Sequence, residues 1–163
     1  MAKQVTVSML KEENKAYDDF LEVPVDYDGK EHVIKVYPIF KPSKVKNLVD
    51  SLVDFYQNAH KEKVSIQVEE EDDIVAYFIV KYFTDVKFTS SKKAKTIYDE
   101  FQTVLNAKVF QYIFKLFPES SIIEVRERIN EVMETMQRIQ LLNKQIPETI
   151  AKIQLESKEL IKK

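Results

Sequence analysis

Residues 122–160 read IIEVRERINEVMETMQRIQLLNKQIPETIAKIQLESKEL, and this stretch decides the fold of the chain. Positions alternately three and four residues apart are apolar in ten of twelve cases. This spacing predicts an amphipathic helix whose apolar face lies against another helix, within the molecule or on a partner. The positions in this register are Ile122, Val125, Ile129, Val132, Met136, Ile139, Asn143, Ile146, Ile150, Ile153, Ser157 and Leu160.

The length of this helix and its proline predict an interruption. A continuous helix over residues 119–162 would be roughly 65 Å long, whereas a compact body of the preceding residues measures about 35–40 Å. Pro147 cannot donate a hydrogen bond to the carbonyl of Asn143. We therefore expect a break or hinge near residues 143–147.

Upstream of this helix, an Asp-Gly pair predicts a β-hairpin over residues 21–37. A two-residue turn at Asp28-Gly29 pairs Tyr27 with Lys30 and places the apolar residues of both strands on one face. Pro24 lacks an amide hydrogen, which predicts that its strand lies at a sheet edge. The apolar face comprises Leu21, Val23, Val25, Ile34 and Val36.

The segments around the hairpin are less regular. Residues 1–19 alternate apolar and polar side chains only briefly, which fits a short strand or a loose arm. Ser43 is the expected N-cap of a helix that continues through His60. Residues 64–68 alternate and fit a short strand or an extended linker.

A helix is expected from about Asp72 to Phe83, because carboxylates at residues 69–73 favour the positive end of a helix dipole. The β-branched and aromatic content of this segment also fits a strand. Ser90 and Ser91 are expected to cap one helical region with an apolar face over residues 97–117, which Pro118 ends.

These elements predict an α+β fold that is predominantly helical. An N-terminal β-hairpin is followed by a multi-helix body and a long, Pro-interrupted C-terminal amphipathic helix. Residues 1–117 would form the hairpin and the body. Residues 118–163 would form the C-terminal segment, as part of the same domain or as an appendage.

Composition limits the functions that the chain can have. The 163 residues include no cysteine and one glycine, which excludes thiolate chemistry and glycine-rich phosphate loops. The net charge of −2 gives little attraction for nucleic acid or membrane. No signal peptide or membrane-spanning run is evident, so we expect a cytoplasmic protein.

No catalytic, cofactor or metal site is predicted. His32 and His60 lack partner ligands at the spacing of metal sites, and the acidic run 69–73 lacks the alternation and the glycine of a calcium loop. Lysine clusters occur at residues 41–46 and 92–95. The second, with aromatic residues nearby, faintly resembles a nucleic-acid surface, and the overall acidity argues against that function. We expect a binding protein rather than an enzyme.

The apolar face of the C-terminal helix is the predicted partner-binding surface. Self-association through this helix is a second expectation, since a buried Asn143 can pair with itself and fix the register of a parallel dimer. The predicted binding residues are Ile122, Val125, Ile129, Val132, Met136, Ile139, Ile146, Ile150 and Ile153.

Three apolar blocks between the hairpin and the C-terminal helix carry a resemblance. They are VDSLVDFY at residues 49–56, DIVAYFIVKYFTDVKF at 73–88 and VFQYIFKLFP at 109–118. Their order resembles that of the tail assembly chaperones of long-tailed phages and prophages of Gram-positive bacteria. The resemblance covers roughly residues 20–135 in pattern and layout, without a diagnostic motif.

This resemblance implies a non-enzymatic assembly factor in the host cell cytoplasm. Such proteins bind the tape measure protein and keep it soluble while tail tube protein subunits assemble around it. Many also have a longer, frameshifted form, and Lys162-Lys163 is compatible with a slippery codon pair. A structural tail-completion or head–tail connector protein, and a bacterial coiled-coil adaptor or regulator, are the alternatives.

Overall fold

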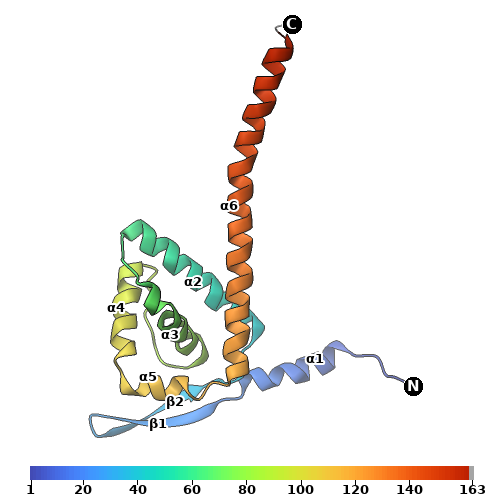
Figure 1. Cartoon of the computed structure of the whole chain (residues 1–163). Coiled ribbons are helices and arrows are strands. Elements are labelled where there is room, and N and C mark those ends of the chain that lie inside the picture. Colours follow the sequence, from blue (N-terminus) through green and yellow to red (C-terminus); the bar gives the residue numbers. More distant parts are fainter. Residues whose placement is uncertain (162–163) are drawn as a thin grey trace. The chain divides into compact units, whose positions relative to one another are not determined.

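The computed structural model describes residues 1–161, with side chains through Leu155. It separates into two compact units, Met1–Val125 and the chain from Arg126 onward. The described elements are α1 (Val7–Glu13), η1 (Asn14–Asp18), β1 (Leu21–Tyr27), β2 (Lys30–Val36), α2 (Pro42–Glu62), η2 (Val68–Glu70), α3 (Glu71–Phe83), α4 (Ala94–Leu105), α5 (Lys108–Phe114) and α6 (Glu119–Ile161) (Figure 1). The predicted α+β, mainly helical fold is confirmed.

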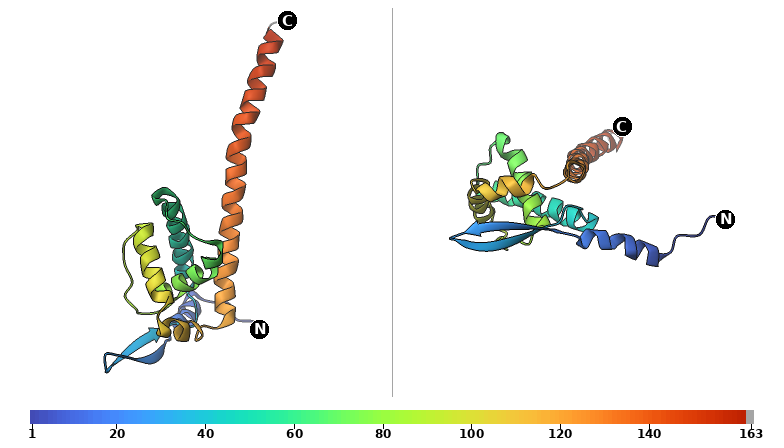
Figure 2. Two further views of the ribbon diagram at one scale, coloured as in Figure 1. Left: turned by 60° about the vertical axis from the view of Figure 1, so that its left-hand side comes forward. Right: turned by 90° about the horizontal axis from the view of Figure 1, so that it is seen from below.

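Helix α3 forms the centre of the first unit. Every residue from Ile74 to Val80 is buried, so this helix is apolar on all sides and needs covering on all sides. Helices α2, α4 and α5 pack against it (Figures 1 and 2). The prediction of a helix here is confirmed, and the alternative strand is excluded.

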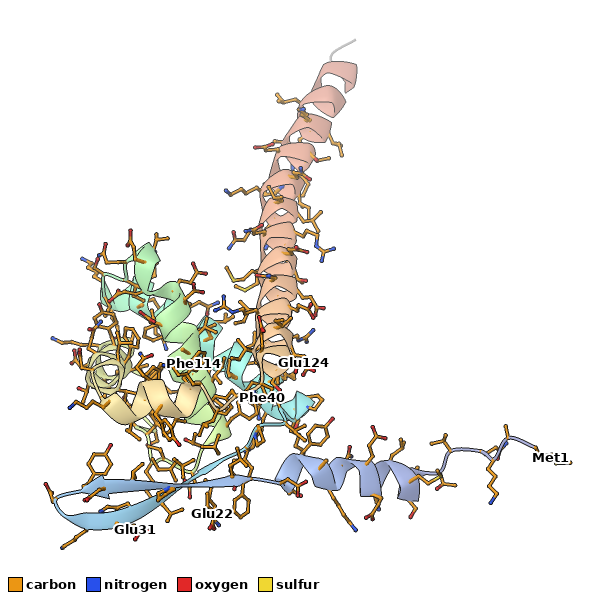
Figure 3. The ribbon with its side chains drawn as sticks, turned by 60° about the horizontal axis from the view of Figure 1, so that its bottom comes forward. Met1, Glu22, Glu31, Phe40, Phe114 and Glu124 are labelled. Atoms are coloured by element: carbon orange, nitrogen blue, oxygen red, sulfur yellow. The ribbon has the colours of Figure 1, made fainter. Side chains whose placement is uncertain are left out.

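Aromatic side chains join α3 to the segments around it. The rings of Phe40 and Phe83 stack with centroids 3.8 Å apart, and Phe117 meets Phe40 edge-on at 5.4 Å. Figure 3 shows Phe40 and Phe114 within the body, whereas Glu22 and Glu31 extend from the hairpin. Tyr77, at the middle of α3, meets three further rings edge-on.

The hairpin has the predicted register throughout, from Leu21 opposite Val36 to Tyr27 opposite Lys30. Asp28 and Gly29 both have positive φ, at 54° and 70°, as a two-residue turn of this kind requires. On the predicted inner face Val23 and Val36 are buried, but Leu21 is 46% exposed.

The strand β2 is also tied to the residues that follow α3. The Tyr37 amide donates to the Phe83 carbonyl at 2.9 Å, and the Asp85 amide donates to the Lys35 carbonyl at 3.1 Å. The Asp85 carboxylate accepts a bond from the Lys35 amide at 2.8 Å. The free edge of the hairpin is therefore β1, the strand that contains Pro24.

Two local predictions are wrong, and a third is confirmed only in part. Residues 7–18 form α1 and η1 rather than a strand or a loose arm, with the Thr6 hydroxyl capping α1. The N-cap of α2 is Lys41, because Pro42 occupies the first helical position and so moves Ser43 into the helix. Residues 68–70 form a 3₁₀ turn, and only 64–67 are an extended linker.

The predicted helical region over residues 97–117 is two helices, α4 and α5, separated by Asn106 and Ala107. Its predicted caps, Ser90 and Ser91, lie upstream of the true N-cap, Lys93. The first amides of α4 donate instead to the carboxylate of Glu62, from Ala94 and Lys95, each at 3.1 Å.

Helix α6 begins within the first unit. The Ser121 hydroxyl donates to the Pro38 carbonyl at 3.0 Å, and Val125 is fully buried. The helix is continuous from Glu119 to Ile161 with Pro147 inside it. The predicted break near residues 143–147 is therefore absent, and a hinge there stays a prediction.

Removing the hydroxyl group of Tyr56 or of Tyr77 is expected to change the free energy of unfolding in opposite directions. The Tyr56 hydroxyl is buried without a hydrogen-bond partner among the described residues, and burial together with Glu71 and Glu70 raises its pKa to about 12. Tyr56→Phe removes this unsatisfied group and should raise the free energy of unfolding by about 1 kcal/mol. Urea unfolding monitored by circular dichroism measures the change.

Tyr77→Phe is the matched control for this substitution. The Tyr77 hydroxyl donates to Glu100 at 2.5 Å, and burial followed by this carboxylate raises the tyrosine pKa. Losing a bond to a charged acceptor should lower the free energy of unfolding by about 1.5–3 kcal/mol. Equal effects of the two substitutions would contradict the assignment of Tyr56 as unsatisfied.

Glu70 predicts a pH dependence of stability. Its carboxylate accepts bonds from the Gln67 amide at 2.9 Å and from Tyr98 and Gln102 at 2.8 Å, and the first of these contributes most to lowering its pKa. A lowered folded-state pKa stabilises the protein above the unfolded pKa of about 4.3. That stabilisation is lost as the pH falls through the folded-state value.

Glu70→Gln should therefore flatten the loss of stability below about pH 5. Thermal unfolding between pH 7 and pH 3 tests this expectation. Glu69→Gln removes a charge from the same turn but none of the three hydrogen bonds. An unchanged acid profile in Glu70→Gln would show that these bonds do not stabilise the charged form.

Candidate protein-binding surface

The histidines and lysines noted in the sequence do not form a metal site within the described residues, and two of the lysines contact neighbouring side chains. His32 lies on β2 with its ring 6.1 Å from that of Tyr27, and His60 is exposed near the end of α2. Within the described residues no group of three or more histidine, aspartate or glutamate side chains is placed to hold a metal ion. Lys44 lies over the ring of Tyr37 at 5.0 Å, and Lys46 pairs with Asp50 at 3.0 Å.

Three glutamates of the first unit hold elements together. Glu62 caps α4, and Glu70 joins η2 to α4 through Tyr98 and Gln102. Glu100 accepts bonds from the Tyr77 hydroxyl and, at 2.7 Å, from the Thr89 amide. Sequence reasoning missed Glu62 and Glu100, whose partners lie on other elements, and it identified Glu70 only as a member of the acidic run 69–73.

Two hollows of the first unit differ in the character of their lining. The smaller hollow, about 250 Å³, has a mixed polar and apolar lining that includes Lys81, whose ammonium donates to the Thr89 carbonyl at 3.2 Å. Burial lowers the pKa of Lys81, and Glu100 partly opposes this effect. The larger hollow, about 390 Å³, is mainly apolar, and its lining includes Val33 on the hairpin and Phe110 on α5.

The predicted binding residues fall into three groups along α6. Val125 is fully buried in the first unit, so its side chain is not available to a partner. Partial exposure is found at Ile122, Ile129, Val132 and Met136. The exposed members are Ile139, Ile146, Ile150 and Ile153, with 52%, 54%, 50% and 56% of each residue accessible.

These four isoleucines are spaced seven, four and three residues apart and therefore lie on one face of the helix. Leu142, 56% exposed, borders this face and was missed by strict three–four spacing. Leu141 and Leu155 are also exposed but lie on the opposite side of the helix. We call Ile139, Leu142, Ile146, Ile150 and Ile153 the isoleucine face.

Charged side chains avoid the isoleucine face. In the usual heptad notation, with Asn143 at an a position, every charged residue between 129 and 155 is at b, c or f, away from the core. Those residues are Glu131, Glu134, Arg138, Lys144, Glu148 and Lys152.

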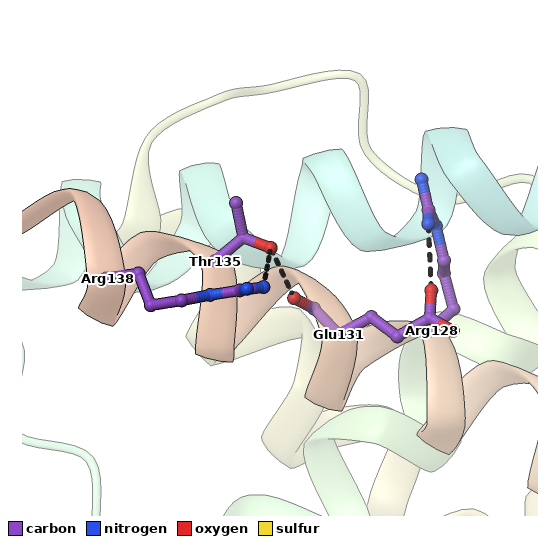
Figure 4. A network of polar contacts seen from close by, with 4 residues as sticks. All are labelled: Arg128, Glu131, Thr135 and Arg138. Carbon is purple, nitrogen blue, oxygen red and sulfur yellow. Dashed lines mark hydrogen bonds and ion pairs between the residues drawn. The ribbon is translucent and has the colours of Figure 1, made fainter.

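Some of these charges make local contacts along the helix. Arg128 pairs with Glu131 at 2.9 Å, and Arg138 donates to the Thr135 hydroxyl at 3.3 Å (Figure 4). The Thr135 hydroxyl in turn donates to the Glu131 carbonyl at 2.8 Å. Helix α6 thus has a charged outer side opposite the uncharged isoleucine face, and such a face can bind another helix by apolar packing.

None of the helices within residues 1–161 has the length and apolar character needed to cross a membrane.

A family model named YomO matches residues 7–162 of this chain. The chain belongs to the YomO family. It is 26% identical, over 98% of its own length and 96% of the relative, to the SPbeta prophage-derived uncharacterized protein YomO of Bacillus subtilis (strain 168). It is thus related over nearly its whole length to a prophage-derived protein. No solved structure matches it.

Proposed function

We propose that this protein is a non-enzymatic phage tail assembly chaperone that binds the tape measure protein and tail tube subunits. It would act in the cytoplasm of the host cell and keep the tape measure protein soluble during tail assembly. The observation that carries the proposal is the isoleucine face of α6. Such a face is a liability in an isolated soluble chain, and it is expected where a helical client is bound.

The relationship to a prophage-derived protein supports a role in phage assembly. The layout of apolar blocks resembles tail assembly chaperones, whose client is a long helical protein. A client helix with its own apolar stripe could pack against the isoleucine face, which carries no charged side chains and would therefore select partners by apolar packing. In the first unit Glu62, Glu70 and Glu100 hold elements together, which leaves them committed to the fold.

A structural tail-completion or head–tail connector protein is the second candidate, since the relationship to a prophage protein favours it equally. The bacterial adaptor or regulator is less favoured for the same reason. The two phage roles differ in where the protein ends up. A chaperone leaves before the particle is complete, whereas a connector stays in it.

Co-expression with the tape measure protein of the same prophage tests the proposal. The chaperone should increase the soluble tape measure fraction and co-purify with it. Ile139→Glu combined with Ile150→Glu should abolish both effects. Each isoleucine contributes at least about 1.5 kcal/mol when buried, so the double substitution should weaken binding by about 100-fold or more.

Glu148→Lys changes a charge on the outer side of the same helix and should bind the client as the wild type does. Mass spectrometry of purified phage particles gives the second readout. Stoichiometric amounts of this protein in the particles would overturn the chaperone role and favour the connector. Loss of binding in Glu148→Lys would show that the isoleucine face is not the contact.

A further inference from the structure

We propose that the part of α6 beyond Asn143 folds as it binds a client: it is open in the free protein and helical in the complex. The unbroken α6 of Figure 1 is then the conformation that binds. This inference rests on the proposed function, because the client is the partner that covers the isoleucine face.

Pro147 lies inside α6 and weakens the helix in two ways. It has no amide hydrogen to donate to the Asn143 carbonyl, and its ring crowds that carbonyl. Compared with alanine, proline at an interior position lowers the equilibrium constant for helix formation by about 100-fold. The helix beyond Pro147 therefore needs a compensating contact.

The single chain does not cover the helix around this proline. From residue 137 to residue 155 every residue is exposed. One side-chain hydrogen bond spans the proline, from the Thr149 hydroxyl to the Gln145 carbonyl at 3.0 Å, and bonds of this kind bend helices more than they stabilise them. Within the described residues, this part of α6 is thus supported mainly by its own backbone hydrogen bonds.

The residues beyond the proline do not compensate for it. An isolated helix of this length is marginal in water even when it is rich in alanine. Thr149, Ile150 and Ile153 are β-branched, and β-branched side chains lower helix propensity. In the free protein the open form of this segment is therefore favoured.

The part of α6 before Asn143 has a firmer start. Val125 is fully buried in the first unit, so the first turns are held in place and the helix needs no new nucleus. Ile129, Val132 and Met136 are only partly exposed. Opening of the helix is therefore expected to begin at the proline and to leave the earlier turns intact.

A bound client helix supplies the missing contact. It would cover Ile146, Ile150 and Ile153, and burial of each isoleucine favours the helical form by at least about tenfold. Together the three isoleucines outweigh the factor of about 100 that opposes the helix at Pro147. The segment is therefore open without a client and helical with one.

Folding on binding also limits the strength of the complex. Part of the interaction with the client is used to order the segment, so the measured affinity is lower than that of a preformed helix. A weaker complex suits a chaperone, because the client has to be released when the tail tube assembles around it.

Pro147→Ala tests the inference through affinity. Equal amounts of wild-type protein and variant compete for a limiting amount of the tape measure protein of the same prophage. Mass spectrometry of the purified complex then gives the ratio of the two chains. If the helix forms only on binding, removing the proline should strengthen binding by up to about 100-fold.

A helix already formed in the free protein gives a different result. The proline would then weaken the free and the bound forms equally, so an unchanged or lower affinity of Pro147→Ala would overturn the inference. Glu148→Ala is the matched control, since it places an alanine beside the proline on the outer side of the helix. It should compete as the wild type does, and a gain as large as that of Pro147→Ala would overturn the role of Pro147.

Nuclear magnetic resonance of the free full-length protein tests the open form without a client. The Cα chemical shifts of residues 148–155 should lie nearer to coil than to helix values in the wild type, and Pro147→Ala should move them toward helix values. Helical shifts in the wild type would overturn the inference. Coil shifts in a protein that does not bind the tape measure protein would overturn the proposed function instead, so the two failures are distinguishable.

Discussion

The complete burial of α3 is the constraint on which the rest of the structure depends. Seven consecutive residues, Ile74 to Val80, are removed from water, and no single neighbour can cover a helix on all its sides. Helices α2, α4 and α5 are therefore required around it. The hairpin is tied to the C-terminal end of α3 by the bond from the Tyr37 amide to the Phe83 carbonyl. Thr84 closes that end by donating its hydroxyl to the Val80 carbonyl at 2.7 Å.

A core arranged around one helix leaves many helix ends and loop amides near its surface. Buried or half-buried amides need acceptors, and the chain supplies them with carboxylates from distant segments. Glu62 serves α4, and Glu100 serves both Tyr77 and the loop at Thr89. These carboxylates are committed to the fold. The isoleucine face of α6 takes no part in these contacts.

The sequence was informative where a structure depends on neighbouring residues. The Asp28-Gly29 turn determined the hairpin register, because both positive φ angles favour this pair. Burial of α3 was readable from its unbroken apolar run. The caps of α2 and α4 could not be predicted in this way. In α2, Pro42 takes the first helical position and moves the N-cap to Lys41, and in α4 the first amides bond to Glu62 from another helix. The brief alternation within residues 1–19 predicted a short strand or a loose arm, but Thr6 caps a helix there.

The isoleucine face was half predictable for the same reason. Periodicity identified Ile139, Ile146 and Ile150, but it could not tell that Val125 is buried within the first unit. Whether the helix continues past Pro147 depends on free energy rather than on periodicity. A proline within a helix costs about 3 kcal/mol, and an isolated helix in water has little reserve. Two isoleucines that gain a partner contribute about 3–6 kcal/mol together, which offsets the proline. An unbroken α6 is therefore most stable when its isoleucine face is covered, so continuity of the helix and occupation of that face depend on the same contact.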